Sequence, residues 1–217
     1  MEKLYNTNSL SFQVFNELER QIINGILTPG TSLTENRLCE QFSVSRTPIR
    51  EALRMLEQKG LVQITPNKGA VVLGISEKDL TDIYTIRMYV EGLASRWAAS
   101  KITDEQLEKL TEVVELQEFY QNRASSEQIN DLDTRFHELI YEYSDSRTLQ
   151  HTLSNLHHMI QHYRQRSFSS DGRAPKAIKE HRDILNALIA HDADLAEKLT
   201  VEHIANAHAN LLSLIVK

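Results

Sequence analysis

The sequence predicts a mainly α protein in which an N-terminal winged helix-turn-helix is followed by an all-α six-helix bundle. Three helical patterns fill residues 10–60, and two short segments rich in Val and Ile follow around a Pro-Asn-Lys-Gly turn. From Ser76 onward the strand signals stop, and Pro175 is the only proline in that part of the sequence. This change in character predicts two domains, residues 1–74 and residues 75–217.

The first two helices are indicated by apolar periodicity and by the residues at their ends. Residues 14–22 carry an apolar residue at every fourth position. Ser9 or Ser11 can cap this helix, and Gly25 lies where a helix commonly ends. Thr34 can cap the short helix ENRLCEQF, which follows.

The third helix begins after the connection SVSR, where Ser45 is a suitable N-cap, and Gly60 ends it. Pro48 falls in its first turn, where a missing N–H costs little. Its apolar face consists of Ile49, Ala52, Leu53 and Leu56. The segment LVQITPNKGAVVLG then predicts two strands, and three helices with a hairpin are typical of a winged helix-turn-helix.

The remainder of the chain predicts six helices with short breaks between them. Ser76 with Asp79, and Thr103 with Gln106, have the spacing of capping boxes. The predicted helices cover residues 77–101, 104–122, 127–143, 147–167, 174–190 and 193–215.

The composition is that of a soluble globular protein, with 41% apolar and 25% charged residues. The single cysteine, Cys39, excludes an internal disulfide. No apolar run approaches the ~20 residues of a membrane span, and the N-terminus lacks the basic-then-apolar order of a signal peptide. We therefore expect a cytoplasmic protein without a membrane partner.

The charge is unevenly distributed along the chain. Residues 1–74 carry a net charge of +1 and residues 75–217 a net charge of −7, which together give the total of −6. A negatively charged binding partner is therefore expected only for the first third of the chain. There, the placement of the basic residues matters more than the net charge.

Arg46 and Arg50 lie one turn apart at the start of the third helix, away from its apolar face. The helix macrodipole disfavours cations there. A recognition helix, however, inserts its first residues into the major groove of DNA, where phosphates and base edges are the partners. Either arginine could bind guanine O6 and N7, which is worth about 1–3 kcal/mol of discrimination. For a single arginine, a solvated surface charge would be the better explanation.

Other polar residues complete this predicted DNA-binding surface. Ser45 and Thr47 offer hydroxyls to phosphates or bases. Arg37 on the preceding helix is placed to meet the DNA backbone, and Lys68 and Gly69 at the tip of the wing could enter the minor groove.

The string LTENRLCEQFSVSRTPIREALRMLEQKGLV, with its wing PNKGAVV, closely resembles the N-terminal domain of GntR-superfamily transcriptional regulators. The run SRTPIREAL is its most specific part, and the family more often has Val where Ile49 stands. The resemblance implies operator contacts by Arg37, Arg46, Arg50 and Gly69, with Ser45 and Thr47 alongside.

Helical phase points three of the nine histidines, and one aspartate, toward the interior of the bundle. Asp133 and His137 lie one turn apart and can chelate one metal ion from a single helix. His181 and His203 share faces with apolar residues of two other predicted helices. Each histidine alone is more often a hydrogen-bonded core residue, and spacing cannot prove that the three helices converge.

Residues 76–217 resemble the FCD effector domain of the FadR-like branch, through LTDIYTIRMYVEGLASRWAA, DTRFHELI, EHRDILNAL, HDADLAEKL and EH in that order. Many members bind a divalent metal through an Asp and three His. The resemblance implies this role for Asp133, His137, His181 and His203. Zn²⁺ suits an imidazole-rich site best, Ni²⁺ and Mn²⁺ stay open, and a purely structural metal is a further alternative.

Arg87 adjoins an apolar stripe on the first bundle helix, made of Ile83, Ile86, Val90, Leu93 and Trp97. A guanidinium that enters a core needs an anion, because an unpaired buried charge is costly. Both an internal salt bridge and bidentate recognition of an effector carboxylate are open. The family resemblance implies the effector role.

These features predict a metabolite-responsive transcriptional regulator, a repressor by resemblance, and not an enzyme. It would bind a palindromic double-stranded DNA operator as a homodimer, because one recognition helix covers only a half-site. Its effector would be a small carboxylate held near the metal. Two alternatives remain: a regulator for which the ion itself is the signal, and a metal-dependent enzyme, which is disfavoured because no further general base lies beside the four ligands.

Overall fold

The computed structural model describes residues 9–65, 69–121, 123, 126–168, 170 and 172–215. The chain divides into two compact units, residues 1–79 and residues 80–217, which we describe separately. The domain boundary between residues 74 and 75 stays a prediction. Within the described residues, no helix combines the length and apolar character that a membrane span requires.

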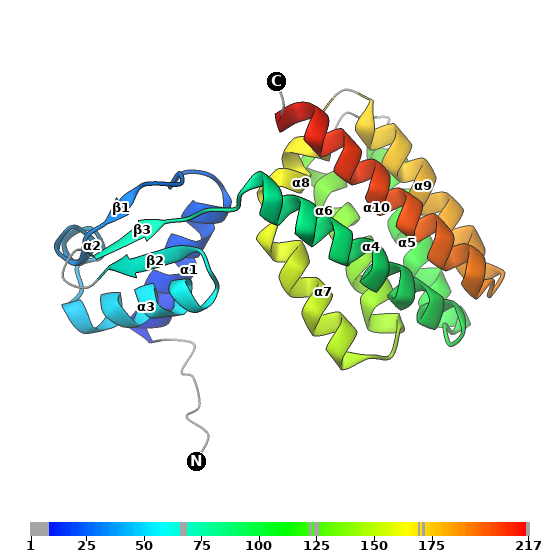
Figure 1. Ribbon diagram of the computed structural model, residues 1–217. Coiled ribbons are helices and arrows are strands. Elements are labelled where there is room, and N and C mark those ends of the chain that lie inside the picture. Colours follow the sequence, from blue (N-terminus) through cyan, green and yellow to red (C-terminus); the bar gives the residue numbers. More distant parts are fainter. Residues whose placement is uncertain are drawn as a thin grey trace, which may run out of the picture. The chain divides into compact units, whose positions relative to one another are not determined.

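The N-terminal unit is the predicted winged helix-turn-helix with one additional strand (Figure 1). Its elements are α1 (Leu10–Ile23), β1 (Ser32–Leu33), α2 (Glu35–Phe42), α3 (Arg46–Gln58), β2 (Val62–Thr65) and β3 (Gly69–Val72). The strands are antiparallel in the order β1-β3-β2, with Leu33 opposite Ala70 and Ile64 also opposite Ala70. The central strand is therefore β3, whose first residue, Gly69, ends the turn of the wing.

Local signals set the start of α1 and the ends of α1 and α3 as predicted. Thr34 and Ser45 occupy the N-cap positions of α2 and α3, but neither side chain makes a capping hydrogen bond. The Ser9 hydroxyl accepts a hydrogen bond from the Phe12 N–H at 3.2 Å and caps α1. Gly25 and Gly60 follow the C-cap residues of α1 and α3 with φ of 69° and 71°, the left-handed conformation that favours glycine. The predicted face of α3 is buried against α1, with Ile49, Ala52, Leu53 and Leu56 at most 2% exposed.

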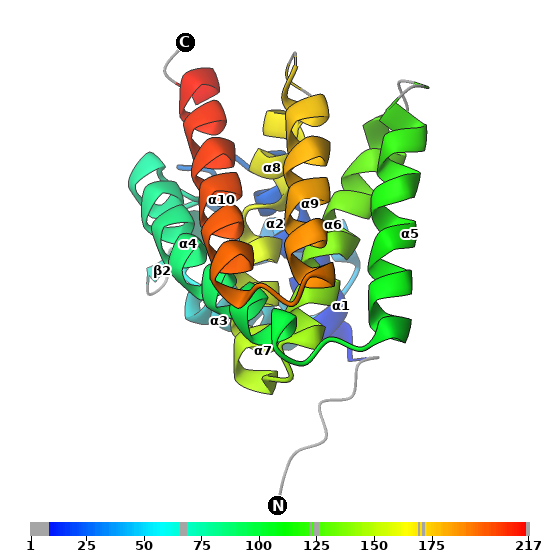
Figure 2. The same cartoon turned by 90° about the vertical axis from the view of Figure 1, so that its right-hand side faces the viewer.

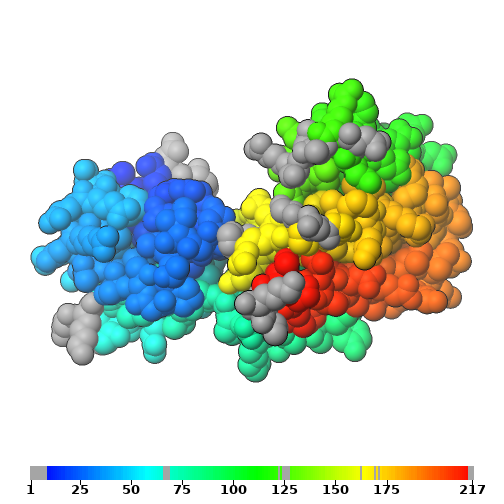
Figure 3. All heavy atoms as spheres, turned by 90° about the horizontal axis from the view of Figure 1, so that it is seen from above, coloured from blue at the N-terminus to red at the C-terminus, as the bar shows by residue number. Residues whose placement is uncertain are grey.

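The second unit is the predicted helical bundle, with seven helices in its described residues (Figure 2). In Figures 2 and 3, α9 lies between α5 and α10. The helices are α4 (Glu77–Ala99), α5 (Asp104–Gln121), α6 (Ser126–Tyr143), α7 (Arg147–Met159), α8 (Gln161–Phe168), α9 (Arg173–Ile189) and α10 (Ala193–Ile215).

The helix predicted over residues 147–167 is two helices, so a count of six is wrong. The chain breaks at Ile160, which has φ −104° and ψ 11° and is fully buried. Neither Gly nor Pro marks this position. The break therefore lies at a buried apolar residue, where no local signal of the sequence predicts it.

Both predicted capping boxes of the bundle are present. Ser76 donates its hydroxyl and backbone N–H to Asp79, whose N–H returns to the Ser76 hydroxyl. Thr103 N–H donates to Gln106 Oε1 at 3.0 Å, and the Gln106 N–H returns to the Thr103 hydroxyl.

Helices α4 and α10 approach closely at Gly92. A Cβ atom at this position would lie 2.8 Å from Cγ2 of Val201. One turn further, the Thr200 hydroxyl donates to the Ser95 hydroxyl at 2.7 Å, and both residues are buried. The absence of a side chain at Gly92 lets the two helices touch.

Candidate functional site

The exposed arginines of α3 are held by the first turn of α2. Arg46 Nη2 donates to Asn36 Oδ1 at 3.1 Å, and Arg50 Nε donates to Glu35 Oε1 at 2.8 Å. The Arg50 side chain is 58% exposed. The guanidinium of Arg50 is the main cause that lowers the pKa of Glu35. Both arginines are therefore oriented by hydrogen bonds and remain accessible from solvent.

These arginines border a cleft of about 520 Å³ on the N-terminal unit. The cleft brings α2, α3 and the wing together, because its lining includes Thr34, Arg46, Arg50, Arg54 and Gly69. An open, basic cleft beside the N-terminal turns of a recognition helix is a suitable surface for a DNA phosphate backbone and its base edges.

The other predicted DNA-binding residues lie around this cleft or outside it. Ser45 and Thr47 are exposed at the start of α3, and the Ser45 hydroxyl makes no capping hydrogen bond. Arg37 is exposed and lines a different, smaller depression beside α1 and β1. Lys68 lies outside the described residues.

Gly69 is required by the backbone of the wing. Its φ is +89°, and a Cβ atom there would lie 2.4 Å from the Leu33 carbonyl oxygen. Only glycine allows β1 and β3 to approach at this point.

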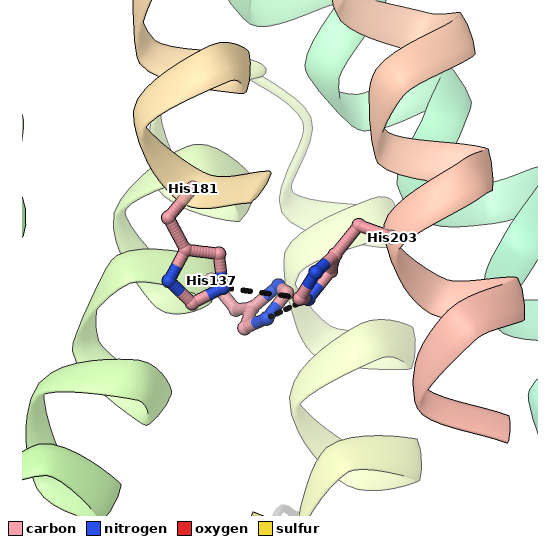
Figure 4. Close-up of side chains that lie close together, drawn as sticks. All are labelled: His137, His181 and His203. Carbon is pink, nitrogen blue, oxygen red and sulfur yellow. Dashed lines mark hydrogen bonds between the residues drawn. The ribbon is translucent and has the colours of Figure 1, made fainter. Parts of the chain in front are cut away.

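In the second unit, three buried histidines from three helices meet (Figure 4). His203 Nε2 lies 3.3 Å from His137 Nε2 and 3.4 Å from His181 Nε2. The potential ligand atoms of the three residues lie within 4.8 Å of one another. The structure thus brings together three of the predicted metal ligands, from α6, α9 and α10.

The opposite ring nitrogen of each histidine faces an oxygen of another side chain. His137 Nδ1 lies 3.0 Å from Glu91 Oε2, His181 Nδ1 lies 2.9 Å from Gln117 Oε1, and His203 Nδ1 lies 2.7 Å from Glu180 Oε2. The hydrogen bonds of His181 and His203 favour the tautomer with the proton on Nδ1, which leaves the Nε2 lone pair unprotonated.

Burial favours the neutral form of two of these rings, His181 and His203. Desolvation lowers the pKa of His181 well below its ordinary value, and lowers that of His203 although Glu180 opposes the shift. Two neutral rings with their protons on Nδ1 cannot hydrogen-bond through Nε2, because both atoms are acceptors. A cation between the three Nε2 atoms would give each lone pair a partner.

Asp133, the fourth predicted ligand, lies beside this cluster. Its Oδ1 is 3.6 Å from His181 Nε2, and its Oδ2 accepts a hydrogen bond from Arg164. Three imidazole nitrogens and one carboxylate oxygen form a donor set that fits Zn²⁺ and also Ni²⁺ or Mn²⁺. The residues present therefore fit a divalent metal.

Arg87 is buried and carries the internal salt bridge that the sequence left open. Its Nε donates to Glu91 Oε1 at 2.6 Å, on the same helix. Desolvation opposes the ionised forms of both groups. Their mutual attraction outweighs it, so the pKa of Arg87 is raised and that of Glu91 is lowered. Glu91 thereby connects Arg87 to His137.

The apolar stripe predicted beside Arg87 is wrong as the inward face of α4. Ile86 and Trp97 are 47% and 39% exposed, whereas Arg87 and Glu91 are at most 2% exposed. The polar pair takes the interior position because His137 supplies a partner from another helix. Apolar periodicity alone could not reveal that partner.

Several functional residues were missed by the sequence reasoning. Glu91, Gln117 and Glu180 hold the histidines, and Arg164 and Arg173 contact Asp133 and Glu180. The only signal in the sequence was their occurrence on helical faces otherwise occupied by apolar residues. Glu180 is 23 positions from His203, and Gln117 is 64 positions from His181, so no local sequence pattern relates these residues.

A small cavity adjoins the histidine cluster. It has about 20 Å³ open to water, which is room for about one molecule, since a water needs roughly 10–15 Å³ on this measure. Its lining includes three arginines, one aspartate and two histidines, and comprises Tyr84, Arg87, Asp133, His137, Arg164, Ser167, Phe168, Arg173, His203 and Ala207.

Comparison with known proteins identifies the family. The FCD domain matches residues 82–206, and the bacterial regulatory proteins of the gntR family match residues 10–72. The chain belongs to the GntR family. It is a GntR-type transcriptional regulator with an FCD domain, and the known proteins of this family that it resembles are DNA-binding regulators rather than enzymes.

Two relatives and one solved structure cover nearly the whole GntR-family chain. The transcriptional repressor RspR of Escherichia coli is 31% identical over 93% of this chain and 89% of its own. The galactonate operon transcriptional repressor of Escherichia coli is 27% identical over 89% and 93% of the two chains. The structure of E. coli McbR/YncC superposes with a TM-score of 0.73 at 27% identity, covering 95% of this chain and 99% of that one.

Proposed function

We propose that this GntR-family regulator is a homodimeric repressor whose FCD domain binds a divalent metal and a small carboxylate effector. Binding of the effector changes the affinity for a palindromic operator. Because the operator is DNA on a bacterial chromosome, the proposal places the protein in the cytoplasm. The observation that carries it is the convergence of His137, His181 and His203, each with its Nδ1 held by another side chain.

The proposed metal ligands are Asp133, His137, His181 and His203, with Zn²⁺ favoured over Ni²⁺ and Mn²⁺. When bound, such an ion supplies positive charge, and an ion with octahedral coordination would keep open positions for an anionic ligand beyond the four protein ligands. The chain's own residues orient the ligands: Gln117 fixes the His181 ring, and Arg164 leaves Oδ1 of Asp133 facing His181.

The effector is proposed to be a carboxylate because guanidinium groups of Arg87, Arg164 and Arg173 line the cavity beside these ligands. The galactonate operon repressor, a relative, is named for the operon of an organic acid, which supports the same class. An effector is larger than one water, so the cavity walls must move to admit it. A ligand that requires such a movement favours one conformation over another, as regulation demands.

The proposed DNA contacts divide into two kinds. Arg46 and Arg50 read base edges from the first turns of α3, where both are exposed. The residues proposed to contact the sugar-phosphate backbone or the minor groove are Arg37, Ser45, Thr47, Lys68 and Gly69.

The exposed apolar side of α4 supports a homodimer. Ile86, Tyr89 and Trp97 are 47%, 75% and 39% exposed and follow one side of the helix at helical spacing. Exposed apolar surface of this kind marks interaction sites. A second copy is the proposed occupant, since a palindromic operator needs two recognition helices related by twofold symmetry.

Native mass spectrometry of the chain, purified without added metal or chelator and then titrated with Zn²⁺, tests the proposal. We expect a dimer with one metal per chain. Operator binding, measured by fluorescence anisotropy on a DNA duplex selected from a random pool, should then respond to organic acids and require the metal. A chain that takes up none of Zn²⁺, Ni²⁺ and Mn²⁺ would contradict the metal site. An operator response to the metal alone would favour a metal sensor.

A further inference from the structure

We propose that the effector is a short dicarboxylate and that Tyr84 and Arg87 bind its second carboxylate. The inference rests on the proposed function, which assigns the first carboxylate to the side of the cavity formed by the histidine cluster. Tyr84 thereby becomes a specificity-determining residue that the sequence did not single out.

The first support is a pair of buried donors without acceptors. The Tyr84 hydroxyl and Arg87 Nη1 have no hydrogen-bond partner among the described residues. Tyr84 is fully buried and Arg87 is 2% exposed, and both line the cavity. A buried donor without an acceptor destabilises the fold, and this cost is recovered only if something brings acceptor oxygens to the donor.

The two donors belong to one rigid surface. The Arg87 guanidinium lies 4.9 Å from the centre of the Tyr84 ring, and this ring stacks on His208 at 4.9 Å with 7° between the planes. Burial raises the pKa of Tyr84, which keeps its hydroxyl protonated and able to donate. Two buried donors from neighbouring turns of α4 are thus available to the two oxygens of one carboxylate.

The second support is the balance of buried charge. Among the described residues, the charged side chains that line the cavity or bond to its lining form three pairs: Arg87 with Glu91, Arg164 with Asp133, and Arg173 with Glu180. The charges cancel within these three pairs. A divalent ion would add two positive charges at the histidine cluster beside the cavity.

Uncompensated charge in a low-dielectric interior is costly, and a partner of opposite charge removes the cost. A monocarboxylate would neutralise half of the added charge, whereas a dicarboxylate would neutralise all of it. The free donors belong to α4 and the carboxylate of Asp133 belongs to α6, so the two ends of one ligand would meet side chains of different helices.

Isothermal titration calorimetry of the full chain loaded with one equivalent of Zn²⁺ tests the inference. The probes are malonate, succinate and glutarate, each compared with the monocarboxylate of equal chain length, and 4-hydroxybutyrate. At least one dicarboxylate should bind about tenfold or more tightly than its monocarboxylate partner. Tyr84→Phe should remove most of that difference and leave monocarboxylate binding within about twofold, because only the hydroxyl is lost and the ring stack remains.

Tyr120→Phe, the same change on α5, is the matched control and should leave every affinity unchanged. Zn²⁺ uptake by Tyr84→Phe checks that the variant retains the histidine cluster. A wild-type chain that takes up no Zn²⁺ would contradict the proposed function itself.

If Zn²⁺ is taken up but dicarboxylates bind no better than monocarboxylates, the inference is overturned while the proposed function stands. Equal binding of 4-hydroxybutyrate and succinate would show that a hydroxyl, not a carboxylate, occupies the subsite. A Tyr84→Phe variant that weakens both classes of acid equally would assign Tyr84 a merely structural role.

Discussion

His137 and His203 are 66 positions apart in the chain, yet their Nε2 atoms lie 3.3 Å apart. Their Nδ1 atoms are held by Glu91 and Glu180 at 3.0 and 2.7 Å. Holding each ring from behind directs both lone pairs to the same point. With the proton of each ring on Nδ1, the two Nε2 atoms would both be acceptors, and a shared metal ion would give both lone pairs a partner.

Zn²⁺ should stabilise the helical domain. At a free concentration 100 times the dissociation constant, the free energy of unfolding should rise by about 2.7 kcal/mol, and EDTA should reverse the gain. Thermal unfolding followed by circular dichroism measures it. His203→Ala should abolish the response, whereas His151→Ala, a change of an exposed histidine on α7, should preserve it. An unaltered response in His203→Ala would remove that residue from the site.

Gln117 should act on the metal through His181. Gln117→Met keeps the volume and removes the oxygen that accepts from His181 Nδ1, so the ring is no longer fixed. The affinity for Zn²⁺, measured by competition with a coloured chelator, should fall by about 10–100-fold. Gln128→Met, on the exposed side of α6, is the control and should change nothing. Equal affinities of wild type and Gln117→Met would mean that packing alone orients His181.

Arg50→Ala should weaken binding to the selected operator by about 1–3 kcal/mol and relax the preference for one base pair. Arg20→Ala removes the same charge from α1 and is the matched control. Fluorescence anisotropy at two salt concentrations separates the effects. If Arg50→Ala loses as much affinity for random DNA as for the operator, the residue contacts phosphate and reads no base.

Gly69→Ala should distort the wing, whereas Gly60→Ala should not. Both glycines have positive φ, so each alanine carries a backbone penalty of about 1–2 kcal/mol. Only at Gly69 would the new Cβ meet a backbone atom, the Leu33 oxygen at 2.4 Å, while Gly60 has nothing within 4 Å. Chemical denaturation should therefore rank Gly69→Ala as the less stable variant. If Gly60→Ala were the less stable variant, β1 and β3 would be able to move apart at Gly69 without loss of stability.

The capping box at the start of α4 should lose its effect in acid. The Ser76 hydroxyl and N–H hydrogen-bond to Asp79 and lower the pKa of its carboxyl below the ordinary 3.8. A carboxyl group whose pKa is lower in the folded chain than in the unfolded chain stabilises the fold at pH values above its unfolded pKa. This contribution is lost as the pH falls through the folded pKa. Ser76→Ala should cost about 1 kcal/mol at pH 7. The difference from wild type should shrink below pH 3.8, and a constant difference would contradict the assignment.

The parts of the fold that local rules control were predictable from the sequence. Gly25 and Gly60 end their helices, and Thr103 with Gln106 forms the expected box, because each signal acts within a few residues. Strand β1 escaped notice because two residues show no alternation and its partner, around Val71, lies far along the chain. The break at Ile160 likewise lies at a buried residue that no local signal marks.

The candidate site divides in the same way. Helical phase correctly turned His137, His181 and His203 inward, since a periodic face needs no knowledge of its neighbours. It could not identify Glu91, which is buried only because Arg87 and His137 both pair with it. Nor could it find the unpaired hydroxyl of Tyr84, because the lack of a partner is a property of the assembled bundle.

The close contact at Gly92 is a point about which α4 could rotate. With a rise of about 1.5 Å per residue, Tyr84 lies roughly 12 Å along the helix from Gly92, and Glu77, the first residue of α4, lies roughly 22 Å from it. A rotation of α4 about its contact with Val201 would therefore move the start of the helix about twice as far as it moves the wall of the cavity. The chain enters α4 directly from the winged unit. A small widening of the cavity would thus be larger at the start of α4, where the chain arrives from the winged unit.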